Sequence, residues 1–220
     1  DLKNLVASIK LSAEVLRHPK TVAKPDVLHK TVSRILEVAD SMQHLISSLL
    51  DVSALEAGRL AVELVPLAVQ PIAQAIIERY QPHAESKRIS LLSSIEPAWV
   101  IGDKVRIQEI IDNLVSNAVK YTPQGGEVRM LLARRGTVVR LVVSDTGPGF
   151  TDEDKQHLFT KFRRLSARPT GGESSTGLGL AIVKKLVELM HGTIWLESTK
   201  GEGAIFYVEL PATDPPPQAP

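Results

Sequence analysis

The sequence predicts an α+β protein in which an N-terminal helical hairpin, forming a dimeric four-helix bundle, precedes an α/β two-layer sandwich. The first 58 residues contain one glycine and repeat apolar side chains with a period of about 3.5, typical of helices that pack on helices. The remainder mixes short apolar strands with amphipathic helices. We therefore divide the chain into the hairpin (1–58), a linker with the first strand (59–66), the sandwich (67–212) and a disordered proline-rich tail (213–220).

Two helices are expected in the hairpin. The second carries two heptad rows, which are Leu28, Ile35, Met42 and Leu49, and Val32, Ala39, Ile46 and Ser53. The first continues the spacing at Leu2, Val6, Ile9, Ala13 and Leu16. Pro19 and Pro25 bracket the turn, Asp26 can cap the second helix, and residue Gly58 can end it. Because one hairpin cannot bury this seam alone, we expect a homodimer; a single hairpin resting on the next domain is the alternative.

From residue 60 the pattern changes to short strands and separate helices. The expected strands are Leu60–Leu64, Ile89–Ile95, Glu127–Arg134, Val138–Asp145, Thr193–Ser198 and Ala204–Leu210. The expected helices are Pro71–Ala84, Lys104–Tyr121 and Gly177–Met190. A turn at Arg135-Gly136 joins two of the strands as an antiparallel pair, which favours one sheet covered by one layer of helices.

Composition excludes several classes of protein. Twenty-six Lys and Arg against 25 Asp and Glu leave a net charge of +1, so bulk charge indicates no surface for nucleic acid. The absence of cysteine from the sequence rules out disulfides, thiolate zinc sites and a cysteine nucleophile. No apolar run approaches the roughly 20 residues that cross a bilayer. With neither a signal peptide nor an initiating Met, we expect a soluble, cytoplasmic piece of a longer protein, without membrane contact of its own.

The predicted helix Lys104–Tyr121 carries two asparagines at the margin of its apolar face. Asn113 and Asn117 are four residues apart, so they share one side of the helix, close to Lys120. Asparagine is a mediocre helix former, which suggests a polar partner outside the helix. Amide oxygens suit Mg²⁺ and a lysine suits phosphate, whereas a solvated helix face is the alternative.

Asp145 ends a predicted strand and is followed by Thr-Gly-Pro-Gly. Leu141 and Val143 alternate before it, so the carboxylate continues the apolar phase of the strand. A buried carboxylate needs a hydrogen-bond donor, and a purine amino group would supply one. Gly147 and Gly149 would let a ring approach the backbone. An aspartate that merely begins a turn is the alternative.

A glycine-rich segment precedes the last predicted helix. It reads Gly171-Gly172 and then Ser175-Thr176-Gly177-Leu178-Gly179-Leu180. Glycines at a helix start expose backbone N–H groups and the positive end of the helix dipole, which can bind an anion. The segment lacks the Gly-Lys-Ser/Thr of a P-loop, and a plain loop is the alternative.

The stretch from Phe150 to Ser175 is polar and longer than most loops inside a compact domain, so we expect a lid. Arg164 could reach a terminal phosphate from this stretch. Phe159 and Phe162 are expected to anchor it in the core.

Taken in order, these motifs resemble the catalytic, ATP-binding domain of two-component sensor histidine kinases. The motifs are Asn113-Leu-Val-Ser-Asn117-Ala-Val-Lys120-Tyr121, Asp145-Thr-Gly-Pro-Gly149-Phe, Phe159-Thr-Lys-Phe162-Arg-Arg164 and Thr176-Gly-Leu-Gly-Leu180. The hairpin resembles the dimerisation and histidine-phosphotransfer domain of the same family, so the resemblance extends from Asp1 to near Pro211. It implies the ATP fold shared with DNA gyrase, MutL proteins and the ninety-kilodalton heat-shock chaperone.

The resemblance implies a role in binding Mg-ATP for each matching residue. Asn117 would hold Mg²⁺ with support from Asn113, and Arg164 would stabilise the transferring γ-phosphoryl group. The implied phosphate contacts are Lys120, Tyr121, Gly177 and Gly179. The implied base contacts are Asp145, for the adenine amino group, with Gly147 and Gly149. The remaining implied ATP contacts are Phe162, Thr176, Leu178 and Leu180.

The resemblance also implies a phosphoacceptor histidine in the hairpin and a response regulator as partner. The family motif reads His-Asp-Leu-Lys-Asn and this sequence begins Asp1-Leu-Lys-Asn4, so the acceptor would immediately precede Asp1. Asp1 would take the imidazole proton, and Asn4 would position water for phosphatase activity. The phosphate would then pass to a regulator aspartate. Leu5 stands where the family often has proline, and none of the six histidines present begins the motif.

Two other functions are weighed against the kinase. An ATP hydrolase of the same fold would use a Glu four residues before the Mg²⁺-binding Asn, but that position is Asn113, a poor general base. A dimeric scaffold that binds ATP without chemistry is the other. The complete set of motifs and the heptad hairpin favour the kinase.

Overall fold

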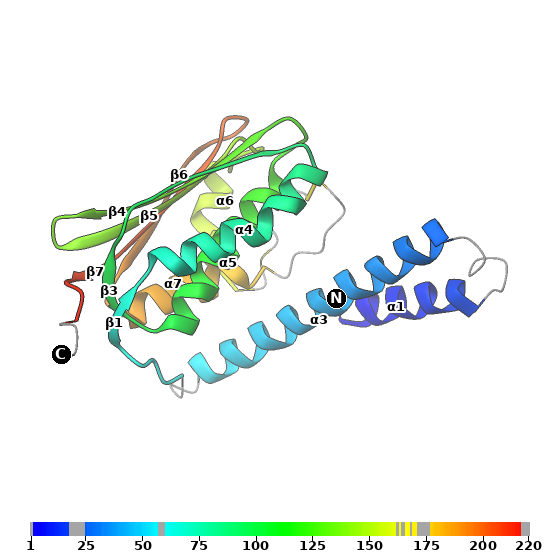
Figure 1. Ribbon diagram of the computed structural model, residues 1–220, viewed down its shortest axis with the longest axis horizontal. Coiled ribbons are helices and arrows are strands. Elements are labelled where there is room, and N and C mark those ends of the chain that lie inside the picture. The colour runs from blue at the N-terminus through cyan, green and yellow to red at the C-terminus, as the bar shows by residue number, and fades with distance from the viewer. Residues whose placement is uncertain are drawn as a thin grey trace. The chain divides into compact units, whose positions relative to one another are not determined.

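The computed structural model describes residues 2–17, 25–56, 60–161, 163, 166–167, 169–170 and 177–216. The chain divides into two compact units, Asp1–Leu60 and Ala61–Pro220. The first is helical and the second combines a mixed sheet with helices (Figure 1), so the predicted α+β class is confirmed.

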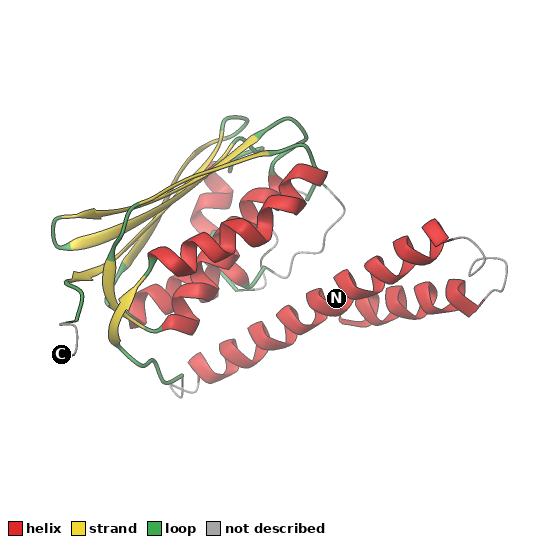
Figure 2. Cartoon of the chain, viewed as in Figure 1, coloured by secondary structure: helices red, strands yellow, loops and turns green. Residues whose placement is uncertain are grey.

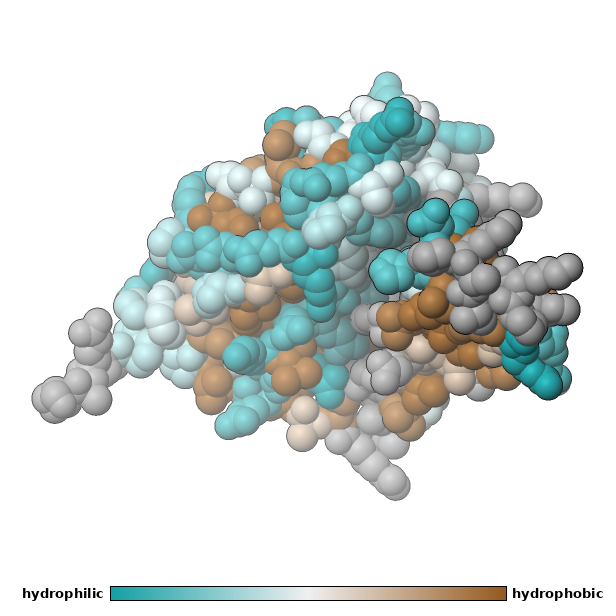
Figure 3. All heavy atoms as spheres, turned by 45° about the vertical axis from the view of Figure 1, so that its right-hand side comes forward, coloured by the Kyte–Doolittle hydropathy of each residue, from teal (hydrophilic) through white to brown (hydrophobic). Residues whose placement is uncertain are grey.

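The described residues of the first unit form a hairpin of two helices, α1 (Leu2–Arg17) and α3 (Pro25–Glu56), which contact each other (Figure 1). In the first heptad row Leu28, Ile35 and Met42 are half-buried. Other large apolar side chains of this unit are exposed: Val6, Leu11, Val15, Val27, Val32, Leu36, Ile46 and Leu50. Figure 3 shows apolar side chains at the surface of this unit. A single hairpin therefore leaves much of its apolar surface uncovered.

The start of α3 agrees with the predicted end of the turn at Pro25. Helix α3 begins at Pro25, with Asp26 in its first turn, and ends at Glu56. Pro19 and Gly58, predicted to bracket the turn and end the helix, lie outside the described residues. Among the described helices, including the 32 residues of α3, none is both long and apolar enough to span a bilayer.

The described part of the second unit contains a seven-stranded sheet. Its strands are β1 (Val65–Ala68), β2 (Ser90–Ile95), β3 (Trp99–Gly102), β4 (Glu127–Arg135), β5 (Val138–Asp145), β6 (Thr193–Thr199) and β7 (Gly203–Thr213). The order is β1-β3-β7-β5-β4-β2, with β6 also paired to β7. β2 and β4 are parallel and the other pairs are antiparallel. The turn between β4 and β5 passes through Gly136 at φ +63°, as the sequence predicts.

Helices cover one face of this sheet (Figure 2). They are α4 (Gln70–Ser86), α5 (Lys104–Tyr121) and α7 (Gly179–Leu189), with the short α6 (Asp152–His157) between β5 and α7 in the chain. The core lies between the layers and includes Ile107 and Leu114 of α5, Ile182 of α7 and Met130 of β4. This arrangement buries the apolar face of α5 and leaves its polar margin for a site.

The structure corrects the predicted first strand. Residues 60–64 form no strand; the strand begins at Val65 instead. The backbone N–H of Glu63 donates to Oδ2 of Asp103 (3.0 Å), so this segment bonds to a side chain rather than to a neighbouring strand. Pro66 suits β1 because β1 lies at the edge of the sheet, where a missing N–H breaks no ladder.

The structure also corrects the predicted tail and contains two elements that were not predicted. Thr213, predicted to begin a disordered tail, pairs with Trp99 as the last residue of β7, and Asp214 forms an ion pair with Arg134 (2.7 Å). Residues 217–220 lie outside the described residues. Strand β3 and helix α6 were not predicted; each is short, with four and six residues, and carries little periodicity.

Candidate functional site

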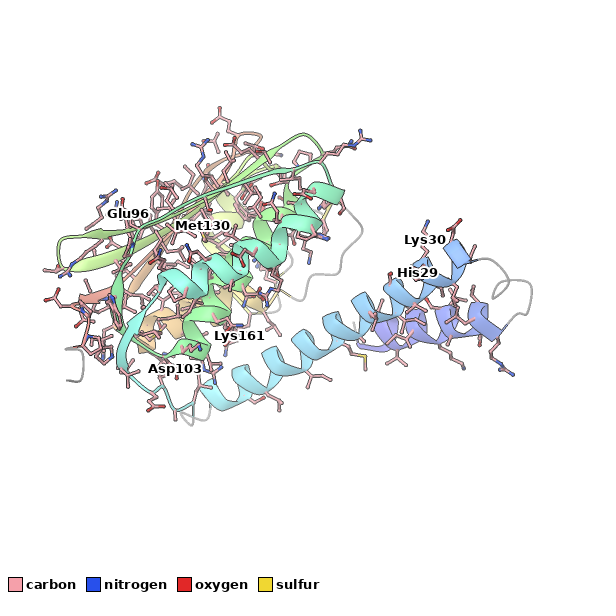
Figure 4. The ribbon with its side chains drawn as sticks, viewed as in Figure 1. His29, Lys30, Glu96, Asp103, Met130 and Lys161 are labelled. Atoms are coloured by element: carbon pink, nitrogen blue, oxygen red, sulfur yellow. The ribbon has the colours of Figure 1, made fainter. Side chains whose placement is uncertain are left out.

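Helix α5 provides the first wall of the candidate site, and Asp103 determines where it begins. Oδ1 of Asp103 accepts hydrogen bonds from the N–H groups of Val105 (2.9 Å) and Arg106 (3.2 Å), which caps the helix (Figure 4). Burial raises the pKa of Asp103, but the backbone hydrogen bonds, that from Glu63 first, outweigh it and lower the pKa below its usual value. The apolar face of α5, which runs from Ile107 to Val119, is buried, so α5 has a fixed rotation.

The fixed rotation places Asn113 and Asn117 at the half-buried margin of α5. The amide nitrogen of Asn113 donates to the carbonyl of Glu109 (2.9 Å), one turn back. Its Oδ1 faces α7: a Cβ built on Gly179 would lie 2.5 Å from it. Among the described residues, the side chain of Asn117 has no hydrogen-bond partner. The structure therefore brings Asn113 and Gly179 together and leaves the Asn117 amide for a ligand.

Asp145 ends β5 between β4 and β7, where it pairs with Val128 and Ala204. Its Oδ1 accepts a hydrogen bond from the N–H of Gly147 (2.8 Å). Burial raises the pKa of Asp145 to about 6, against the lowering effect of backbone hydrogen bonds from Gly147 and Ala204. The carboxylate is thus poorly compensated within the protein and is suited to accept from a ligand donor.

The glycines after Asp145 pack closely against the protein itself. A Cβ on Gly147 would lie 3.2 Å from the carbonyl oxygen of Tyr121, at the end of α5. Gly149 has φ +62° and approaches the carbonyl oxygens of Thr199 and Gly203 too closely for any side chain. These glycines were predicted to admit a ligand ring. In the structure, Gly147 and Gly149 also let the loop after β5 pack against the end of α5 and against the β6–β7 turn.

The end of α5 and the start of α7 form the polar end of the site. Lys120 lies beside Tyr121, with its ammonium 5.7 Å from the ring centroid. Gly177 has φ +68°, which no helical residue adopts, so α7 begins at Gly179 rather than at the predicted Gly177. Leu178, which is buried, has an apolar side chain and cannot cap the helix. The first N–H groups of α7, including that of Leu180, can therefore serve an anion.

Several predicted site residues cannot be placed. Asp1, Phe162, Arg164 and Thr176 lie outside the described residues, as does the Gly171-Gly172 pair. Asn4 belongs to α1. Of the histidines, His29 is exposed on α3 (Figure 4).

Sequence reasoning missed Asp154 and Thr170. Asp154 forms a capping box with Thr151 at the start of α6, and the spacing Thr151-x-x-Asp154 is a signal that could have found it. Thr170 donates from its backbone N–H (3.1 Å) and its hydroxyl (3.0 Å) to the carbonyl oxygen of Lys120. Nothing local in the sequence indicates this contact, because the two residues are 50 positions apart.

Comparison with protein families finds a match within each unit. Residues 102–214 match the family described as histidine kinase-, DNA gyrase B-, and HSP90-like ATPase. Residues 1–58 match the His Kinase A (phospho-acceptor) domain. The two matches follow the division of the chain into a helical unit and a sheet unit.

Individual proteins show the same similarity. The sensor histidine kinase GacS of Pseudomonas protegens is 37% identical over 183 residues, which are 78% of this chain and 20% of GacS. The mycobacterial sensor histidine kinase MprB is similar in structure, with a TM-score of 0.61, 27% identity and coverage of 67% of this chain and 98% of that one. Full-length ShkA in complex with AMPPNP has a TM-score of 0.64 and 29% identity, over 83% of this chain and 39% of ShkA. The chain spans 20% of the length of GacS and 56% of the length of another relative, the adaptive-response sensory kinase SasA.

Replacing Asp145 by Asn should stabilise the protein more at pH 7.5 than at pH 5. Because the pKa of Asp145 rises from 3.8 to about 6 on folding, its contribution to stability is fully present below pH 3.8 and is lost as pH rises through 6. Asparagine keeps an acceptor for Gly147 and carries no charge. Chemical denaturation should show the variant gaining about 1 kcal/mol between these pH values relative to wild type. The exposed Asp152→Asn is the control, and a pH-independent difference would contradict the assignment.

Proposed function

The chain belongs to the histidine kinase-, DNA gyrase B- and HSP90-like ATPase family, and we propose that it is the core of a sensor histidine kinase. It binds Mg-ATP in the sandwich, transfers the γ-phosphoryl group to a histidine that immediately precedes Asp1 of the hairpin, and supplies that phosphate to an aspartate of a response regulator. The observation that carries this proposal is the approach of Gly179 to Asn113, because it sets an anion-binding helix start beside amide ligands.

Different residues would hold the nucleotide base and the metal. Asp145 accepts a hydrogen bond from the adenine amino group, which adds a donor to the two backbone N–H groups that its carboxylate already accepts from. Asn117 offers its amide oxygen to Mg²⁺, and Asn113 supports it from one turn earlier. Bound Mg²⁺ would neutralise charge on the phosphates during transfer. The residues present fit both groups: the Asp145 carboxylate can accept a hydrogen bond from an amino group, and the Asn117 amide oxygen, which has no partner among the described residues, can coordinate a cation.

The phosphates are held by the end of α5 and the start of α7. Lys120 and Tyr121 contact them from α5, while Gly177 and Gly179 allow the N–H groups of α7 to approach. Arg164 stabilises the transferring group. Phosphoryl transfer of this kind requires positioning and charge stabilisation rather than covalent participation by the protein.

Transfer to histidine is favoured over hydrolysis by the residue at position 113. A hydrolase needs a base there, but the Asn113 amide has no basic lone pair, and its nitrogen is committed to the Glu109 carbonyl. The phospho-acceptor match in the same chain supports this choice. In the hairpin Asp1 takes the imidazole proton, and Asn4 positions water when the regulator is dephosphorylated.

The hairpin is also the surface through which two copies pair. Its exposed apolar residues on α1 and α3 are too numerous for an isolated monomer. A second hairpin of the same kind would cover them as a four-helix bundle. Dimerisation through these helices then brings two acceptor helices and two ATP-binding units into one assembly.

Asp145→Asn should weaken binding of a non-hydrolysable ATP analogue with Mg²⁺ by about 100-fold, because it removes a charged acceptor. Wild-type affinity should fall as pH drops through about 6, where Asp145 protonates, and the variant should lack this step. Titration calorimetry measures both effects. Unchanged affinity in Asp145→Asn, with Asp152→Asn as control, would remove the adenine assignment.

A chain extended by one histidine before Asp1 should become phosphorylated with Mg-ATP, because the added residue completes the acceptor motif. The phosphate should be labile in acid and stable in base, as expected for phosphohistidine. The matched chain with alanine at that position should take no label, and Asn117→Ala in the histidine chain should lose it. Equal labelling of the alanine chain would place the acceptor elsewhere.

Leu36→Lys should dissociate the dimer, because it puts a charge into the apolar surface that the partner copy covers. Sedimentation equilibrium should show a rise in the dissociation constant of about 100-fold or more. Lys30→Glu alters an exposed charged residue of α3 and serves as control (Figure 4). A 220-residue chain that stays dimeric in Leu36→Lys would locate the interface outside this surface.

A further inference from the structure

A polar cluster joins α4 to the flank of α5 next to its two asparagines. Asp112, only 7% exposed, forms an ion pair with Arg79 and accepts a hydrogen bond from the hydroxyl of Tyr80. The same hydroxyl contacts that of Ser116, one turn further along α5. Asp112 and Ser116 each immediately precede an asparagine of the site, so they lie about 100° around the helix from the proposed ligands. The cluster therefore binds α5 on the flank beside those ligands.

A second contact joins the ends of the same two helices. Lys87 is the C-cap residue of α4, and its ammonium donates to the carbonyl oxygens of Val119 (2.8 Å) and Lys120 (3.2 Å) in the last turn of α5. Helix α4 packs against α5 (Figure 1), and its own apolar residues Ile72 and Ile76 are buried. Because α4 is anchored in the core and contacts α5 at two levels, it resists rotation of α5 about its axis.

Within the cluster, the hydrogen bond from Tyr80 contributes more to orientation than the ion pair does. The side chain of Arg79 is 51% exposed, and ion pairs in contact with water contribute little. Burial raises the pKa of Tyr80, and the charge and hydrogen bond of Asp112 raise it further. Arg79 and the contact with Ser116 lower it by less, so the hydroxyl keeps its proton and remains a donor throughout the physiological range.

A small rotation of α5 would matter for a metal ion. The buried apolar face decides which side of α5 meets the sheet, but apolar packing is non-directional, whereas hydrogen bonds depend on direction. Side-chain atoms lie about 5 Å from a helix axis, so a rotation of about 10° moves them by about 1 Å. Because Mg²⁺ requires near-ideal octahedral ligand geometry, such a shift would weaken coordination by Asn117. It would not displace Asp145, which belongs to β5.

We propose that Tyr80 and Asp112 are positioning residues for the metal ion: the hydrogen bond between them sets the rotation of α5 at which the Asn117 amide oxygen coordinates Mg²⁺. The proposal rests on the proposed function, since it assumes that Asn117 is a ligand of Mg²⁺ bound with ATP. It assigns Tyr80 and Asp112 no contact with the nucleotide or the metal. Their effect is expected on the part of nucleotide affinity that depends on Mg²⁺, and not on the part that depends on Asp145.

Three variants of the 220-residue chain test the hydrogen bond. Tyr80→Phe removes the donor, and Asp112→Leu removes the acceptor at similar volume. Asp112→Asn keeps both the volume and an acceptor, so it tests rescue. Tyr207→Phe is the matched control, because this tyrosine also donates its hydroxyl to a carboxylate, that of Glu197 (3.1 Å), but on the sheet strands β6 and β7.

Two readouts separate metal positioning from stability. Titration calorimetry gives the affinity for a non-hydrolysable ATP analogue with Mg²⁺ and with EDTA, and the ratio of the two affinities measures the contribution of the metal. Nuclear magnetic resonance gives the side-chain amide signals of Asn113 and Asn117 in the protein without nucleotide. The second readout requires neither ATP nor Mg²⁺.

Tyr80→Phe and Asp112→Leu should each lower the affinity ratio by about five- to tenfold, because the metal ligand is displaced while the base contact is kept. Their affinity with EDTA should stay within about twofold of wild type, and the double variant should add little to either single one. Asp112→Asn and Tyr207→Phe should keep the wild-type ratio within about twofold. The Asn117 amide signals should shift in Tyr80→Phe and Asp112→Leu only.

An equal loss of affinity with Mg²⁺ and with EDTA would mean that the cluster only stabilises the fold, and it would overturn the proposal. A wild-type affinity ratio in Tyr80→Phe would overturn it too. If Asp112→Leu does not fold, Tyr80→Phe decides, because phenylalanine keeps the packing of the ring. A wild-type chain that binds no nucleotide refutes the proposed function, whereas the amide signals still decide whether the hydrogen bond orients Asn117.

Discussion

The contact between Asn113 and Gly179 is the constraint on which the candidate site depends. The amide nitrogen of Asn113 is committed to its own helix, so its oxygen must face α7, and α7 can come this close only because residue 179 lacks a side chain. Helix α5 cannot turn away, because its apolar stripe is buried against the sheet. Asn117 and Lys120 then take their places along the same margin. One close approach thus aligns three polar residues with the start of a helix.

Long periodic elements could be predicted from the sequence and short ones could not. Helix α5 was predicted from its apolar stripe, and both α5 and β5 have the predicted bounds. Strand β3 has four residues, and its existence depends on pairing with β1 and β7, which are distant in sequence. Tertiary pairing of this kind leaves no local periodicity to detect.

Within the site, residue types could be predicted better than their partners. The phase of β5 indicated that Asp145 is turned inward, and its burial agrees. The contacts of Gly149 with Thr199 and Gly203 depend on the β6–β7 turn, some 50 residues later, which no motif announces. The link between Thr170 and Lys120 is equally non-local. Spacing along the chain identifies candidate ligands, whereas the contacts that hold them arise only from the folded arrangement.

Asp145 and Asp154 show how two inward carboxylates come to serve different purposes. Both are penalised by burial, yet the pKa of Asp145 rises to about 6 and that of Asp154 falls to about 2. The difference lies in the donors: Asp154 has four from Thr151 and Ser166, while Asp145 relies on two backbone N–H groups. A fully satisfied carboxylate suits architecture, and an incompletely satisfied one suits recognition.

The bond between Glu63 and Asp103 has a mechanical consequence. The chain leaving the hairpin unit is fastened, within three residues of Leu60, to the side chain that starts α5. Any tension drawn along that chain must first break this bond, and the acidic group it releases is the one that stabilises the leading turn of α5. A pull on the chain before Glu63 would therefore reach the first turn of the helix that carries the asparagines, through the backbone and the hydrogen bond from Glu63 to Asp103.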